Sequence, residues 1–143
     1  MSEMMIKPNL IALVMCDDIY VDPAGKIALV GLFSDILTNH VPCKHGQIAV
    51  YVSVNGLRPG SKGKLEIVHG ESEHNPIFVA EGRFPDETGP LDVLDMQFIV
   101  NNIAFPLAGK YFVRFWGNDN LVGMRPFYIR VVKEGTPEHK EQP

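Results

Sequence analysis

Three residues whose side chains bind metal ions lie close together in the first half of the chain: His40, Cys43 and His45. Imidazole nitrogens and thiolates are ligands that Zn²⁺ accepts readily. Structural zinc sites usually combine two such short motifs, whereas this stretch supplies one, so the three residues are weak metal candidates. The simpler interpretation is a surface loop with scattered histidines, and we expect no metal and no other cofactor.

Nucleophilic catalysis has little support in the residue pattern. The sequence contains no Gly-x-Ser-x-Gly turn of the hydrolase type. Cys16 ends an apolar run, where burial usually makes a thiol unreactive. Cys43 would need a histidine in direct contact, which spacing along the chain does not establish. We therefore expect a protein that is not an enzyme.

Composition limits the classes of partner. The chain has 143 residues, of which 45% are hydrophobic and 21% are charged, as in ordinary single globular domains. Its net charge of −4 argues against the basic surface that nucleic acids or anionic membranes require. No apolar run approaches the roughly 18 residues of a membrane span. We expect neither nucleic acid nor a membrane as a partner.

The two cysteines are too few for a disulfide scaffold. The apolar run over residues 10–16 resembles a lipoprotein signal that ends at Cys16. However, the run is short, and Met15 is not the small residue that signal cleavage needs. We therefore interpret it as a strand and expect a cytoplasmic protein with free thiols. A single bridge between the two cysteines is the alternative.

The elements that must position any site are predicted to be strands. Short apolar runs are separated by turn residues, and the 13 glycines and 11 prolines are spread along the chain. Alternation of apolar and polar residues predicts about eight strands, each with one row on a core. They cover residues 10–21, 26–33, 47–55, 64–69, 77–84, 91–100, 110–116 and 127–132. We expect an all-β protein, a two-layer antiparallel β-sandwich, with a small β-barrel as the alternative. The one candidate helical turn covers residues 34–37.

The chain is predicted to form one domain with two tails. Residues 1–9 are expected to be a flexible N-terminal tail, and residues 10–133 the sandwich domain. Residues 134–143 are polar throughout and are expected to be a disordered C-terminal tail.

The clearest pattern is a hairpin over residues 105–132, with a polar turn at residues 117–120. One row of side chains faces the core, and the outward row contains Phe112, Arg114, Trp116, Tyr128 and Arg130. Aromatic residues and arginine dominate interface hot spots, so this face is the candidate interface. Two alternatives remain: a long loop such as residues 34–46 covers the face, or the register is shifted by one residue, which exchanges the two rows.

Two blocks of the sequence resemble a family. The first block contains Ala12-Leu13, Cys16-Asp17, Gly25-Lys26 and Leu29-Val30-Gly31-Leu32-Phe33, and the second contains Phe105-Pro106, Gly109, Tyr111, Leu121-Val122-Gly123, Pro126-Phe127 and Val131. Together they are similar to a family of small, uncharacterised prokaryotic β-sandwich domains of unknown function. The resemblance implies a β-sandwich and no activity, and it assigns no site residues.

These observations together predict a non-catalytic protein-interaction or structural accessory domain. We expect it to bind a protein partner, and in particular to self-associate through the outer face of the C-terminal hairpin. The alternative is a small-ligand or metal-binding domain, possibly enzymatic, that uses the loops at one end of the sandwich.

Overall fold

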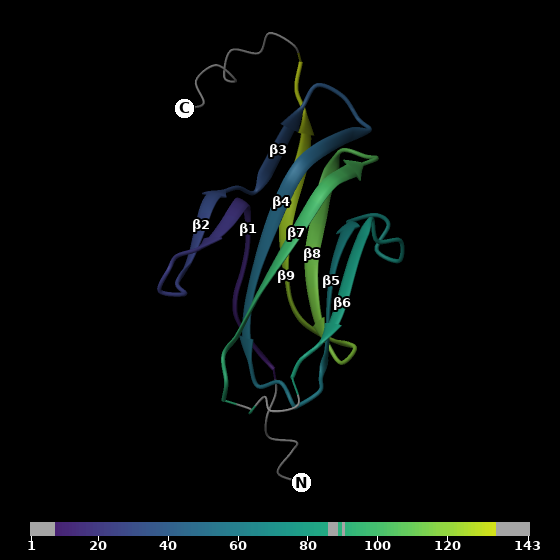
Figure 1. Cartoon of the computed structure of the whole chain (residues 1–143). Coiled ribbons are helices and arrows are strands. Elements are labelled where there is room, and N and C mark those ends of the chain that lie inside the picture. Colours follow the sequence, from purple (N-terminus) through teal and green to yellow (C-terminus); the bar gives the residue numbers. More distant parts are fainter. Residues whose placement is uncertain (1–7, 86–88, 90, 134–143) are drawn as a thin grey trace.

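The computed structural model describes residues 8–85, 89 and 91–133, and these residues form nine strands in two layers (Figure 1). Sheet A has the order β2-β1-β4-β7 and contains β1 (Asn9–Val21), β2 (Ile27–Leu32), β4 (Cys43–Asn55) and β7 (Leu94–Phe105). Sheet B has the order β3-β9-β8-β5-β6 and contains β3 (Asp35–Thr38), β5 (Lys62–His69), β6 (Phe78–Arg83), β8 (Gly109–Gly117) and β9 (Asn120–Val131). The predicted two-layer β-sandwich is confirmed.

One strand and one pairing differ from the prediction. The expected helical turn over residues 34–37 is wrong, because β3 lies there and pairs with β9 in parallel. Backbone hydrogen bonds from Tyr128 N to Ser34 O (2.9 Å) and from Val132 N to Thr38 O (2.8 Å) continue this pairing at both ends. Ile36 is buried in the core, so the short strand adds an apolar side chain to the sandwich. The other strand pairs are antiparallel.

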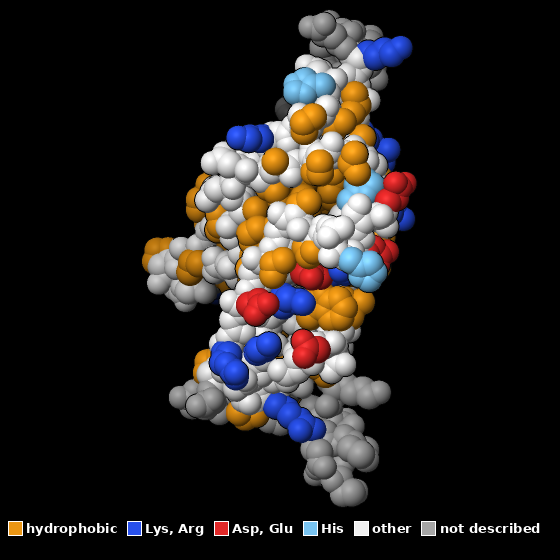
Figure 2. Space-filling view, turned by 90° about the vertical axis from the view of Figure 1, so that its right-hand side faces the viewer, with side chains coloured by type: hydrophobic (Ala, Val, Ile, Leu, Met, Phe, Trp, Pro, Cys, Tyr) orange, Lys and Arg blue, Asp and Glu red, His pale blue; other side chains and the backbone are white. Residues whose placement is uncertain are grey.

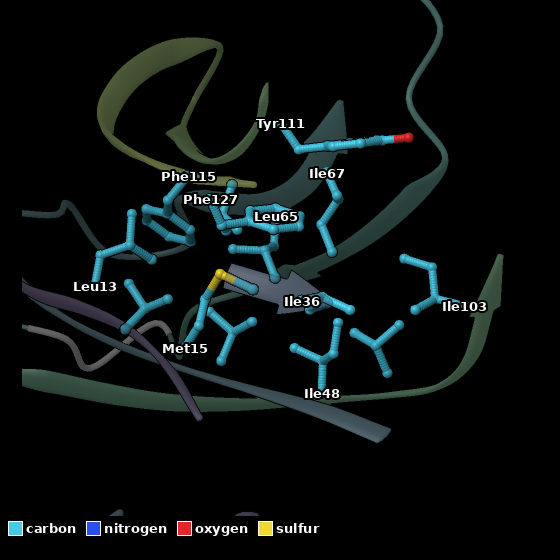
Figure 3. Packing of buried hydrophobic residues seen from close by; sticks show 14 of the residues in the cluster. Leu13, Met15, Ile36, Ile48, Leu65, Ile67, Ile103, Tyr111, Phe115 and Phe127 are labelled. Carbon is cyan, nitrogen blue, oxygen red and sulfur yellow. The ribbon is translucent and has the colours of Figure 1, made fainter. Parts of the chain in front are cut away.

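Side chains from the inner faces of both sheets form one core (Figure 3). At one end of it the Phe105 ring of β7 meets the Tyr111 and Phe127 rings of sheet B, with centroid distances of 5.2 and 5.9 Å. The Tyr111 hydroxyl donates a hydrogen bond to the Leu107 carbonyl oxygen (2.6 Å), which ties the β7–β8 connection to the core. Burial raises the pKa of Tyr111, so the hydroxyl keeps its proton for this bond.

The predicted tails fall largely on residues that the structure does not describe. Residues 1–7 and 134–143 lie outside the described residues, whereas Asn9 already pairs with Asn55 in sheet A. Residues 10–16 belong to β1, as the strand interpretation of that run predicts. In the described part of the chain, no helix is long and apolar enough to cross a membrane.

Candidate protein-interaction surface

The C-terminal hairpin has the predicted register. Gly117 ends β8 and Asn120 begins β9, and the two residues between them, Asn118 and Asp119, have φ angles of +50° and +70°. Asparagine and aspartate tolerate this conformation better than most residues, which explains the tight turn. The inward row of Tyr111, Val113, Phe115, Phe127 and Ile129 is buried. A one-residue shift of the register is therefore excluded.

The five candidate residues accordingly lie on the outer face of sheet B. Phe112, Arg114, Trp116 and Tyr128 are half-buried, and Arg130 is exposed. They divide into two groups of contacts: one around Tyr128 on β9, and one around Glu66 on β5, which neighbours β8.

In the first group, cations lie against aromatic rings. Lys110 Nζ is 5.5 Å from the Phe112 ring centroid and 5.9 Å from that of Tyr128. The Arg130 guanidinium is 4.7 Å from the Tyr128 centroid, and its Nε also pairs with Asp35 Oδ1 at 2.9 Å. Exposed cation–aromatic contacts of this kind contribute about 0.5–1 kcal/mol each. The two rings are thus held in place with cations over them.

In the second group, one carboxylate accepts several hydrogen bonds. Glu66 Oε1 accepts from Trp116 Nε1 (2.8 Å) and from Arg114 Nε (3.2 Å) and Nη2 (3.1 Å). Only 9% of the Glu66 side chain and 14% of the Arg114 side chain are exposed. The polar atoms of Trp116 and Arg114 are therefore engaged within the chain. We call Glu66, Arg114 and Trp116 the Glu66 cluster.

The segment that partly covers this face is not the predicted one. Residues 34–46 contain β3, which extends the edge of sheet B and does not lie over it. Instead, the connection between β5 and β6 approaches the face, because Arg114 Nη2 donates to the Glu73 carbonyl oxygen (3.0 Å). Val68, an outward residue of β5, is fully buried. The prediction that residues 34–46 cover the face is wrong, and part of the face is covered by residues 70–77.

The rest of the face carries exposed apolar side chains. Met124 and Leu121 of β9 are 47% and 46% exposed, and Leu37 of β3 is 44% exposed. Met124 is paired with Arg114, and Leu37 with Arg130, so both lie among the outward candidates. Aliphatic and aromatic surface thus continues along β9. Sequence analysis missed these three residues and Glu66, although outward alternation along β9 would have identified Met124.

The weak metal candidates do not form a ligand set. His40 is exposed in the connection before β4, Cys43 packs against the core, and the His45 ring lies 6.0 Å from the Phe33 ring. Among the residues that the structure describes, no three His, Cys, Asp or Glu side chains gather where they could hold a metal ion.

The two cysteines are expected to differ in reactivity. Both are free; Cys16 is fully buried, and burial raises the pKa of its thiol, whereas Cys43 is half-buried. Because the thiolate is the reactive form, a thiol reagent should label Cys43 at least about tenfold faster than Cys16 in the native protein. Labelling kinetics followed by peptide mass spectrometry measure this, with Cys43→Ser as the control that leaves only the slow site. Equal rates at the two positions would contradict the burial of Cys16.

Comparison with known proteins adds a family and two distant structures. The model of Family of unknown function (DUF6941) matches residues 11–130. No curated protein matches the chain. The alkylpurine DNA glycosylase AlkC of Pseudomonas fluorescens, bound to DNA containing an abasic site analog, is 11% identical with a TM-score of 0.45; the match covers 83% of this chain and 30% of that one. An immunoglobulin-like protein from Pseudomonas aeruginosa is 11% identical with a TM-score of 0.44, over 87% of this chain and 97% of that one.

Proposed function

We propose that this chain, which belongs to the DUF6941 family of unknown function, is a non-catalytic interaction domain. It self-associates through the outer face of sheet B. The observation that carries the proposal is the exposed apolar surface along β9. Leu121 and Met124 lie on the same face as the half-buried rings of Phe112 and Tyr128. Contiguous apolar surface of this kind is typical of contact sites in soluble proteins.

The polar groups of the face support binding rather than chemistry. Trp116 and Arg114 donate hydrogen bonds to Glu66, and Arg114 also donates one to the Glu73 carbonyl oxygen. What the face offers to a partner is therefore aromatic and aliphatic surface, bordered by the cations Lys110 and Arg130. Interfaces are enriched in aromatic residues, methionine and arginine in this way.

A second copy of the chain is the partner that the charges favour. The face carries exposed charges of both signs: Lys110 and Arg130 are positive, and Asp35 and Glu73 are negative. In a two-fold dimer the same surface meets itself, so a cation of one copy is able to meet a carboxylate of the other. Such ion pairs would fix how the two copies align while the apolar side chains make the contact.

Replacing Tyr128 and Met124 together with serine should weaken self-association. Both side chains lie outward, so the expected effect is on assembly: the dimer dissociation constant should rise at least about tenfold, or about 1.4 kcal/mol. Sedimentation equilibrium measures the constant. The matched control is Tyr20→Ser, because Tyr20 is 55% exposed on the other sheet. If the double variant assembles like the wild type, or if the control dissociates instead, the outer face of sheet B is not the interface.

The proposal also includes a compartment. The free thiols of Cys16 and Cys43 suit a reducing environment such as a prokaryotic cytoplasm. Nucleic acid is not the proposed partner, because the net charge of −4 disfavours binding to phosphates.

A further inference from the structure

The β7 strand forms one edge of sheet A. It pairs with β4 along its whole length, from Leu94 opposite Val54 to Phe105 opposite Cys43. Among the described residues, no strand pairs with its other side. Along such an edge, alternate N–H and C=O groups point away from the sheet and are available to another strand. Proteins often block edges with lysine or proline, but β7 contains neither, and its one charge is Asp95.

An apolar groove of about 280 Å³ lies beside this edge, between β7 and β6. Met96 and Phe98 line it from β7, and Phe84 lines it at the end of β6. Gly82 of β6, which is paired with Gly63 of β5, lines the groove and contributes no side chain to it. A Cβ atom at Gly82 would meet no atom within 4 Å, so this corner of the sandwich has unfilled space.

Figure 2 shows the side of the molecule that lies to the right in Figure 1, where β6 is found. Hydrophobic side chains gather in the upper and middle parts of this side, and charged side chains border them below. The charged residues that line the groove itself are Glu81 and Arg83 of β6. The groove is an apolar space next to an unpaired strand edge.

We propose that β7 and this groove bind an extended segment of a partner protein, which pairs with β7 as an added strand and inserts apolar side chains into the groove. Side chains of a strand alternate between two faces, so every second residue of the segment would enter the groove. Asp95 lies on the outer face of sheet A, where Tyr51 donates a hydrogen bond to it at 2.7 Å. An outward lysine or arginine of the segment would complement this carboxylate.

A free segment fits this site better than the edge strand of a second copy. The inward side chains of β7, including Met96 and Phe98, already pack against the core of their own sandwich. Pairing two copies through β7 would satisfy the edge hydrogen bonds but would leave both grooves unfilled. The site is therefore distinct from the self-association surface on sheet B and takes a different occupant.

The test selects peptides from a display library of random twelve-residue peptides on the immobilised full-length chain. The expected winners have apolar residues at alternate positions and a cation at an outward position. Their dissociation constants are then measured by fluorescence anisotropy against the wild type, Gly82→Leu and Gly46→Leu. A Cβ atom has free space at both glycines, so the two variants are matched, but only Gly82 lines the groove. Gly82→Leu should weaken binding at least tenfold, and Gly46→Leu should leave it unchanged.

A second measurement uses the wild-type protein and does not depend on how the variants fold. In the selected peptide, every second amide would face β7. N-methylation of that set of amides should abolish binding, whereas N-methylation of the other set should leave binding unchanged. The proposal would be overturned if the selected peptides showed no alternation. It would also be overturned if neither N-methylation of the peptide nor Gly82→Leu changed the dissociation constant. A selection that yields no binder would overturn it as well. The Tyr128 and Met124 double variant should bind the peptide normally, which separates this site from the self-association surface.

Discussion

Replacing Phe127 with alanine is expected to lower the free energy of unfolding by about 3–5 kcal/mol, the usual range for a fully buried phenylalanine. Phe127 is fully buried, and its ring lies 5.4 Å from the Tyr111 ring and 5.9 Å from the Phe105 ring. Phe105 belongs to sheet A, whereas Tyr111 and Phe127 belong to sheet B. Removing the Phe127 ring therefore leaves a cavity where the two layers meet. Equilibrium unfolding in urea measures the loss.

The neighbouring residue supplies the control for this prediction. Tyr128 is half-buried on the opposite face of the same strand, where it contacts Lys110 and Arg130. Tyr128→Ala should cost only about 1 kcal/mol, because it removes two cation–aromatic contacts and opens no cavity. Comparable losses for Phe127→Ala and Tyr128→Ala would mean that the inward and outward rows of β9 are assigned incorrectly.

Replacing Glu66 with alanine is expected to lower the free energy of unfolding by about 3 kcal/mol. The substitution leaves the Trp116 indole N–H and the Arg114 guanidinium without their acceptor, on a part of the face where the Arg114 side chain is only 14% exposed. Arg114 keeps its contacts to Glu73, which limits the loss. Thermal or urea unfolding measures it.

Two variants make the Glu66 prediction specific. Glu66→Gln keeps an oxygen that can accept from Trp116 but removes the charge that pairs with Arg114, so its loss should be intermediate. Glu81 is exposed on the adjacent strand, so Glu81→Ala should change stability by no more than about 0.5 kcal/mol. A Glu66→Ala protein as stable as the Glu81→Ala protein would show that the Glu66 cluster contributes nothing measurable.

The part of the C-terminal hairpin far from the turn was predictable because its alternation is regular: Tyr111, Val113 and Phe115 of β8 and Phe127 and Ile129 of β9 are buried. In such a stretch the apolar row alone determines which side faces the core. The outward positions of Phe112, Arg114, Trp116, Tyr128 and Arg130 followed directly from that row.

The first half of β9 was missed, because the predicted second strand covers residues 127–132 whereas β9 begins at Asn120. A bulge between Phe115 and Trp116 shifts the register near the turn, so Leu121 and Met124 both lie outward although they are three positions apart.

The prediction began β4 too late, at residue 47, and ended β7 too early, at residue 100, because the alternation of both strands changes phase. Along β7 the buried residues are Val100 and then Ile103, three positions apart, and Asn102 between them has a φ angle of +54°. Gly46 lies opposite this point on β4, where the paired register also skips a residue on each strand. A search for strict alternation stops at such a point, although the two strands continue together beyond it.

Interactions between strands far apart in the sequence were not predictable. Glu66 and Arg114 are 48 positions apart, and they meet because β5 and β8 are neighbours in sheet B. The groove likewise depends on Gly82 of β6, and on β6 and β7 lying on the same side of the two layers. Alternation gives the face of each residue but not the strand order, so both features required the structure.

The solution mass of the wild-type protein tests the central claim most directly. Light scattering should be recorded at protein concentrations from about 1 µM to about 100 µM. A dimer with a dissociation constant in the micromolar range forms within these limits. Self-association through the outer face of sheet B predicts that the mass rises with concentration to twice that of the 15.9 kDa chain. A mass of 15.9 kDa at every concentration would contradict the account.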